Sequence, residues 1–260
     1  MKKVILITGA SSGIGKDIAE YLVEKGFVVY GVSRRDVADA KFHHVKADVC
    51  DHARMVEVFE QIISEQGRLD VVVNNAGMGI GGAVEDTPKH LVEKIFSVNV
   101  LALMDICSLA VNYLRESRGK IINIGSVAGV VPIPFQSYYS ATKAAVESFS
   151  LALANEVKNF GIGVCCVRPG DTKTGFTSAR IKNDDSKKYD GRIESSIKKM
   201  EKDEQNGVSP RCVSKVVLRV INKKKTPLVK TVGGSYKLVC GLVKVLPVSL
   251  ASAIIKKIYG

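Results

Sequence analysis

The sequence predicts a single α/β domain built on a doubly wound parallel sheet of about seven strands. Short apolar runs, typical of strands buried on both faces, alternate along the chain with longer segments of helical periodicity. The chain has 260 residues and is 46% hydrophobic, which suits one large core and argues against disorder. Because no internal repeat or linker interrupts the alternation, we treat residues 1–260 as one domain.

The first half of the chain alternates strands and helices from its start. A glycine-rich turn ends the first apolar run, and Gly26 marks the end of the helix that follows. The predicted elements are a strand at residues 3–8, a helix ending near Gly26, a strand at 27–33, a short strand at 42–47, a helix at 52–66 and a strand at 69–74.

The second half continues the pattern and adds two special segments. Residues 171–207 are polar and mixed, and we interpret 175–207 as a mobile lid over the substrate. Residues 235–260 form an amphipathic C-terminal extension. The other predicted elements are a helix at 88–114, a strand at 120–125, a helix at 137–160, a strand at 162–168, a helix at 210–222 and a strand at 227–232.

The turn after the first strand has the composition of a phosphate-binding loop. Its glycines allow the backbone to approach a pyrophosphate, which rests on the N-terminus of the next helix. The spacing of the glycines is GxxxGxG. A purely structural turn is the alternative interpretation, but the strand before the turn and the helix after it favour a dinucleotide site. The predicted contacts are Gly9, Ser11, Ser12, Gly13, Ile14 and Gly15.

Arg34 and Arg35 follow the second strand, where an acidic residue would bind a ribose 2′-hydroxyl. Arginine suits a 2′-phosphate, because its planar donor group makes charge-assisted and often bidentate hydrogen bonds. The pair therefore favours NADP(H), with NAD(H) as the second option. Two solvated surface arginines are the alternative interpretation.

Two further strand ends predict contacts with the same cofactor. Asp48, next to Val49, could accept a hydrogen bond from the adenine amino group. Asp51 could equally cap the following helix. Small residues after the fourth strand would let the backbone pass close to the cofactor; they are Asn75, Ala76 and Gly77.

Tyr139 and Lys143 are four residues apart at the start of a helical segment, which places both side chains on one face. A nearby ammonium favours the phenolate, and Ser126, at the end of the preceding strand, could reach the same point. The three groups could give a proton to a carbonyl oxygen or take one from an alcohol. The spacing alone is weak evidence for a catalytic pair, because Tyr21 and Lys25 have the same spacing on an ordinary helix face.

Asn99 lies within the predicted helix at 88–114, between two valines. An asparagine in the middle of a helix disfavours that helix slightly, so its side chain should have a specific partner. We consider two interpretations, a satisfied amide in the core and a group in a proton relay.

The cysteines and the N-terminus indicate a cytoplasmic protein. Six cysteines occur without a CxxC pair, which favours free thiols in a reducing compartment, and we expect no metal site. The chain enters a strand pattern at once, so we expect no signal peptide. We also expect no apolar run long enough to span a membrane.

The net charge of +12 is concentrated at the C-terminal end. Residues 205–260 contain 11 basic residues and no acidic one. A cationic amphipathic helix over residues 235–258 could lie on an anionic membrane, so peripheral membrane contact is one hypothesis. The alternative is a segment that covers the substrate or a subunit contact. We expect no nucleic-acid binding, because no binding motif accompanies the charge.

Taken together, these segments resemble the short-chain dehydrogenase/reductase superfamily, whose members are oxidoreductases with a Rossmann-like fold. The resemblance covers about residues 3–175. It rests on Thr8-Gly9-xxx-Gly13-x-Gly15, Asn74-Asn75-Ala76-Gly77, Asn99, Ser126, Tyr139-xxx-Lys143 and Pro169-Gly170-xxx-Thr174, which occur in the family's order.

The resemblance implies hydride transfer between NADP(H) and a secondary alcohol or carbonyl compound, with Tyr139 as general acid/base. It implies that Lys143 lowers the pKa of Tyr139 and holds the nicotinamide ribose. Ser126 would polarise the substrate oxygen, and Asn99 would hold a water that relays the proton.

The resemblance also adds cofactor contacts, namely Pro169, Gly170, Thr172 and Thr174. Thr172 stands where family members commonly have an apolar residue, which would alter the grip on the nicotinamide amide. The C-terminal half is similar to members related to hydroxysteroid and retinol dehydrogenases, which implies a lipophilic or steroid-like substrate.

The family implies a homodimer or homotetramer built on the helices at 88–114 and 137–160. A dinucleotide-binding sensor on the same fold is the alternative function. The complete set of four catalytic positions favours an enzyme.

Overall fold

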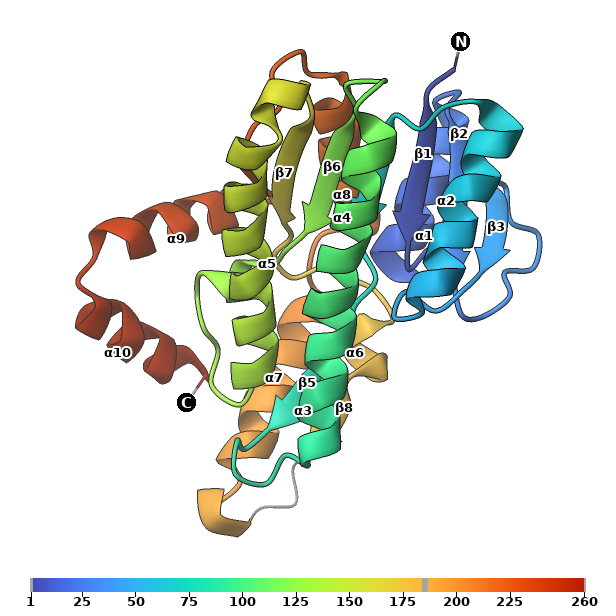
Figure 1. Cartoon of the computed structure of the whole chain (residues 1–260). Coiled ribbons are helices and arrows are strands. Elements are labelled where there is room, and N and C mark those ends of the chain that lie inside the picture. Colours follow the sequence, from blue (N-terminus) through green and yellow to red (C-terminus); the bar gives the residue numbers. More distant parts are fainter. Residues whose placement is uncertain (1, 184–186, 260) are drawn as a thin grey trace.

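The computed structural model, which describes residues 2–183 and 187–259, has a seven-stranded parallel sheet at its centre (Figure 1). The order β3-β2-β1-β4-β6-β7-β9 confirms the predicted doubly wound fold. The strands are β1 (Val4–Thr8), β2 (Val28–Ser33), β3 (His43–Lys46), β4 (Val71–Asn74), β6 (Lys120–Ile124), β7 (Gly163–Arg168) and β9 (Val229–Thr231).

Helices cover both faces of the sheet. On one face, α1 (Gly13–Glu24) and α8 (Pro210–Asn222) pack against Ile5 and Ile7 of β1. The helices of the other face pack against Val4 and Leu6; they are α2 (His52–Gln66), α4 (Ala102–Leu114) and α5 (Ser137–Glu156). Side chains alternate between the faces of a strand, so both sets are buried, and this explains the continuous apolar runs in the sequence.

The direction of winding reverses between β1 and β4. From β1 the sheet extends through β2 to β3 on one side, and through β4, β6, β7 and β9 on the other. In a parallel sheet the carboxyl ends of all strands meet at one edge, and a crevice opens where the winding reverses. The residues that follow Thr8, Ser33, Asn74 and Ile124 are therefore brought together.

The long helix predicted at 88–114 is present, but its middle is wound differently. It consists of α3 (Lys89–Phe96), one π-helical turn at Ser97–Leu101, and α4. Contrary to our expectation, the stretch Lys89–Leu114 is long and apolar enough to cross a membrane by length and composition alone. Its residues Ile95, Leu103 and Ile106 are buried in the protein, so we assign it to the core.

The predicted lid contains more regular structure than its polar sequence indicates. It includes α6 (Phe176–Ala179), β8 (Ile181–Asn183), a 3₁₀ turn at Lys187–Tyr189 and α7 (Arg192–Gln205), while residues 184–186 lie outside the described residues. Strand β8 pairs with β5 (Ile80–Gly82) in a small second sheet that the sequence did not predict. The lid's mobility stays a prediction.

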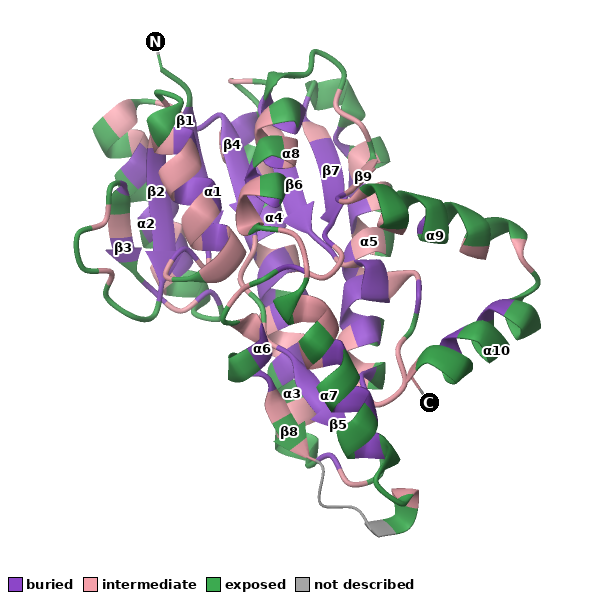
Figure 2. Ribbon diagram, turned by 180° about the vertical axis from the view of Figure 1, so that it is seen from behind, coloured by how far each residue is buried: buried purple, intermediate pink, exposed green. Residues whose placement is uncertain are grey.

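The C-terminal extension is two helices rather than one. They are α9 (Gly234–Val245) and α10 (Val248–Tyr259), separated at Pro247, which cannot continue the first helix. Together they form an open V beside α5 (Figure 2). We call residues 234–259 the C-terminal helix pair.

Candidate active site

A cavity of about 790 Å³ opens at the carboxyl edge of the sheet. All predicted site residues line it except Asn99 and Gly15. One part follows the loops after β1, β2 and β4, and the other extends between α5, α7 and the C-terminal helix pair. The cavity thus combines a crevice at the strand ends with an apolar compartment.

The glycine-rich turn is held against the loop after β4. Gly9 has a φ of +71°, and a Cβ there would lie 2.9 Å from Ala76 Cα. Asn75 Nδ2 donates to the carbonyls of Thr8 and Gly9 at 3.0 and 3.3 Å. A Cβ at Gly15 would lie 2.3 Å from the Gly9 carbonyl oxygen, so Gly15 serves this packing rather than the cavity wall.

Arg34 and Arg35 lie at the mouth of the same crevice. Arg35 Nη2 donates to the hydroxyls of Ser11 and Ser12, both at 3.3 Å, which links the end of β2 to the turn before α1. Arg34 Nη1 lies 3.9 Å from Asp48 Oδ2, and both side chains are exposed. The arginines therefore flank the crevice, which fits the predicted 2′-phosphate position. The Asp51 side chain caps α2 by accepting from the Arg54 amide at 3.0 Å.

The loop after β7 closes the crevice from the opposite side. Thr172 donates to the Gly170 carbonyl at 2.9 Å, and Thr174 accepts from the Phe176 amide at 3.1 Å. Thr174 also packs against Gly13, where a Cβ would lie 3.4 Å from Thr174 Cβ. Pro169, Gly170, Thr172 and Thr174 all line the cavity, as the resemblance implies.

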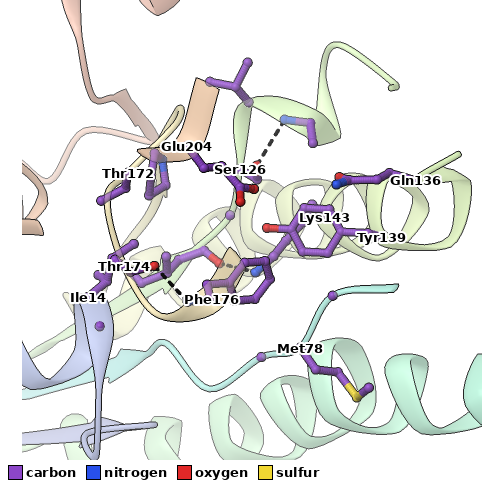
Figure 3. A pocket seen from close by; sticks show the side chains of 18 of the residues that line it. Ile14, Met78, Ser126, Gln136, Tyr139, Lys143, Thr172, Thr174, Phe176 and Glu204 are labelled. Carbon is purple, nitrogen blue, oxygen red and sulfur yellow. Dashed lines mark hydrogen bonds between the residues drawn. The ribbon is translucent and has the colours of Figure 1, made fainter. Parts of the chain in front are cut away.

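Ser126, Tyr139 and Lys143 converge at the junction of the two parts of the cavity (Figure 3). Ser126 follows β6, and the other two residues share one face of α5. Lys143 is buried, donates to the Ile124 carbonyl at 2.8 Å, and lies 5.8 Å from the centre of the Tyr139 ring. The ring of Phe176 lies 5.7 Å from that of Tyr139 and forms the opposite wall.

Burial dominates the electrostatics of this pair. Burial raises the pKa of Tyr139 to about 12, with Glu204 and Asp171 adding to the rise, while a hydrogen bond with Ser126 opposes it. Burial also lowers the pKa of Lys143 to about 8, so its charge is itself disfavoured. Burial is the largest influence on both groups, and the lowering of the Tyr139 pKa by Lys143 stays a prediction.

Asn99 occupies the π-helical turn between α3 and α4 and does not line the cavity. Its Oδ1 accepts from the Met78 amide at 2.8 Å, and its Nδ2 donates to the Met78 carbonyl at 2.9 Å and to Thr142 Oγ1 at 3.1 Å. The side chain is therefore a satisfied amide that fixes the loop after β4. A role in proton relay stays a prediction.

Several residues of the substrate side were not predicted. Glu204 on α7 lines the cavity, accepts from the Thr177 hydroxyl at 2.5 Å and pairs with the buried Arg180. Asp171 accepts from the Tyr236 hydroxyl. Figure 3 shows the Glu204 side chain directed toward Ser126 and the Tyr139 hydroxyl. These partners are far apart in the sequence, and no spacing connects them.

The fold and the cavity at its switch point define an oxidoreductase of the dinucleotide-binding class. The family model described as short chain dehydrogenase matches residues 3–185, so the chain belongs to this family, whose members bind NAD(P)(H).

Similar proteins include two named reductases and a short-chain dehydrogenase of known structure. A 3-ketodihydrosphingosine reductase of Bacteroides thetaiotaomicron is 44% identical over 236 residues, 89% of this chain and 88% of that protein. An NADPH-dependent 1-acyldihydroxyacetone phosphate reductase of Saccharomyces cerevisiae is 31% identical over 69% of this chain and 64% of its own length. The crystal structure of a short-chain dehydrogenase from Streptomyces avermitilis is 31% identical, with a TM-score of 0.84 and coverage of 96% and 95%.

Proposed function

We propose that this protein transfers hydride between NADP(H) and a ketone or secondary alcohol carried on a single-chain amphiphile. The observation that carries this proposal is the position of Ser126 and Tyr139, between a dinucleotide crevice and an apolar compartment. Both named relatives act on a ketone next to a polar group on one long chain. The shared chemistry supports a substrate of this class over a steroid-like one.

Some residues of this chain would hold the cofactor, and others would transfer the proton. The turn Gly9–Ile14, with Arg34 and Arg35, would hold the phosphates, and the loops at Asn75–Gly77 and Pro169–Thr174 would hold the nicotinamide end. When bound, NADPH supplies the hydride that the carbonyl carbon receives.

The side chains beside the reacting oxygen would transfer the proton. Ser126 would donate a hydrogen bond to that oxygen and hold it beside Tyr139. Tyr139 would then donate its proton in reduction and accept one in oxidation. The intact set of Ser126, Tyr139 and Lys143 favours this enzyme over a dinucleotide-binding sensor.

The proposal is tested by following NADPH consumption with a long-chain 3-ketone. Wild type should turn the ketone over, and Tyr139→Phe should lose on the order of 10² to 10⁴-fold in kcat, because the general acid is removed. NADPH binding, followed by fluorescence, should survive the substitution. Unchanged turnover in Tyr139→Phe, or none in wild type across ketones of several chain lengths, would contradict the proposal.

The cofactor preference is tested by titrating NADPH and NADH against wild type and the double variant Arg34→Ala with Arg35→Ala. We expect NADPH to bind more tightly to wild type and to lose this advantage in the variant, roughly tenfold or more, because two charge-assisted contacts disappear. NADH binding should change little. Preference for NADH that the substitutions leave untouched would make the arginines surface charges.

We also propose a cytoplasmic homo-oligomer. The cysteines of the described residues are free, with Cys107, Cys165, Cys166 and Cys240 buried, which suits a reducing compartment. Leu101, the last residue of the π-helical turn before α4, is 60% exposed, and this apolar side chain supports the proposed helical interface.

A further inference from the structure

The C-terminal helix pair presents apolar side chains on its outer surface as well as toward the cavity. Val245 and Val248, on either side of the bend at Pro247, are 78% and 86% exposed. Leu238 on α9 is 66% exposed. None of these three lines the cavity, so they face outward. Exposed apolar side chains grouped on one projecting element mark an interaction surface.

The bend of the V is its most distant point from the body. The start of α9 packs through Tyr236 and Cys240 on Val127 and Val131, and the end of α10 is fixed by the Tyr259 hydroxyl, which donates to Asp203 at 3.3 Å. The bend itself projects away from the sheet and from α5 (Figure 1). It can therefore enter a surface without disturbing the fold.

The same element is uniformly cationic. Lys237, Lys244, Lys256 and Lys257 are exposed on the helix pair, and residues 205–260 contain no acidic residue. Lysines beside outward valines and leucines match a surface with anionic groups above an apolar layer, which describes an anionic lipid bilayer. A symmetrical contact with a second copy would instead bring the lysines of both copies together, which like-charge repulsion opposes.

We infer that the C-terminal helix pair docks on an anionic bilayer, with Val245 and Val248 in the headgroup region and the lysines on lipid phosphates. The inner side of the same helices lines the cavity through Val239, Leu242, Leu246, Ile254 and Ile258. A single-chain lipid leaving the bilayer therefore meets a continuous apolar path that leads to Tyr139. This second part rests on the proposed function, whereas docking does not.

Docking is tested by sedimenting the full-length protein with vesicles of phosphatidylcholine, alone or with about one third phosphatidylglycerol. The wild type should sediment with anionic vesicles only, and added salt should release it. Lys256→Gln with Lys257→Gln removes charge, and Val245→Ser with Val248→Ser removes the apolar bend. Each pair of substitutions should lower the partition coefficient between vesicles and solution by about tenfold.

The matched control is Lys223→Gln with Lys224→Gln, which removes the same charge from the exposed loop after α8 and should sediment like wild type. Wild type that stays in solution with anionic vesicles overturns the inference, as do variants that all sediment equally. A third outcome is that wild type binds no vesicles and that Val245→Ser with Val248→Ser no longer self-associates. The surface would then contact a second copy, and the inference of membrane docking would be overturned.

Failure of docking and failure of the proposed function are distinguishable. Both test pairs lie outside the cavity wall, so turnover of a short, water-soluble ketone without vesicles should equal that of wild type. A protein that binds anionic vesicles but reduces no ketone would retain the docking and lose the proposed function. A protein that reduces ketones equally well with and without docking-competent vesicles would overturn the path from bilayer to cavity.

Discussion

The ionisation of Tyr139 is opposed by its own surroundings. Burial is the main cause of its raised pKa, and the charges of Glu204 and Asp171 add to it, while Ser126 and Arg180 act in the other direction. A tyrosine with a pKa of about 12 is protonated at neutral pH, which suits a general acid in ketone reduction. The raised pKa therefore makes the ionised form, which oxidation would need, the harder one to reach.

Glu204→Gln should consequently ease oxidation of the alcohol. Oxidation needs the ionised tyrosine, so its rate rises as the pH approaches the pKa of Tyr139. Removing the Glu204 charge lowers that pKa and leaves the Arg180 charge uncompensated, and both effects shift the pH–rate profile for oxidation toward lower pH. The profile of kcat/KM measures this shift. Glu201→Gln on the same helix is the control, and an unmoved or upward-shifted profile would contradict the assignment.

The sequence identifies those site residues that are spaced within one helix or one loop. Tyr139 and Lys143 are on one helix face, and Gly9 to Gly15 span one loop and the start of α1, so the local pattern identifies them. Glu204 and Arg180 are 24 residues apart and meet only after α6, β8 and α7 have folded. The pKa of Tyr139 likewise depends on burial, which no local spacing reports.

Among the elements, β5 is the one with the weakest sequence signal. Two of its three residues are glycines, which have low strand propensity. The structure supplies a reason for Gly82, whose φ is +153° and where a Cβ would lie 2.3 Å from the Asn183 carbonyl oxygen of β8. The long strands and helices, in contrast, follow the periodicity of the sequence, and the break between α9 and α10 had a visible signal in Pro247.

Gly82→Ala should therefore destabilise the protein by about 1–3 kcal/mol, because the backbone conformation is strained for alanine and β8 must move away. The free energy of unfolding in urea measures the change. Gly241→Ala in α9 is the matched control, since no atom lies near its Cβ position, and it should stabilise by about 0.5–1 kcal/mol. Equal behaviour of the two variants would show that the close approach of β5 and β8 is not needed.

Over the whole molecule, the cavity joins elements from both ends of the chain. Its cofactor side is built by the first 180 residues, which resemble the family closely, whereas its apolar side is formed largely by α7, α9 and α10. The polar segment 171–207 and the C-terminal amphipathicity were visible in the sequence. Their convergence on one compartment was not, because it depends on the long-range packing of α10 against α7.

The apolar compartment predicts that substrate preference depends on chain length. Each buried methylene contributes about 0.8 kcal/mol at most, so kcat/KM for a series of medium-chain 3-ketones should rise roughly two- to fourfold per carbon until the compartment is filled. Leu246→Ser with Ile254→Ser makes its wall polar and should flatten this slope, while kcat/KM for the shortest ketone stays within about threefold of wild type. Val245→Ser with Val248→Ser, outside the wall, should keep the wild-type slope without vesicles. If kcat/KM of wild type does not change with chain length, the compartment does not take part in substrate recognition. Only the polar end of the ketone would then be recognised, beside Tyr139.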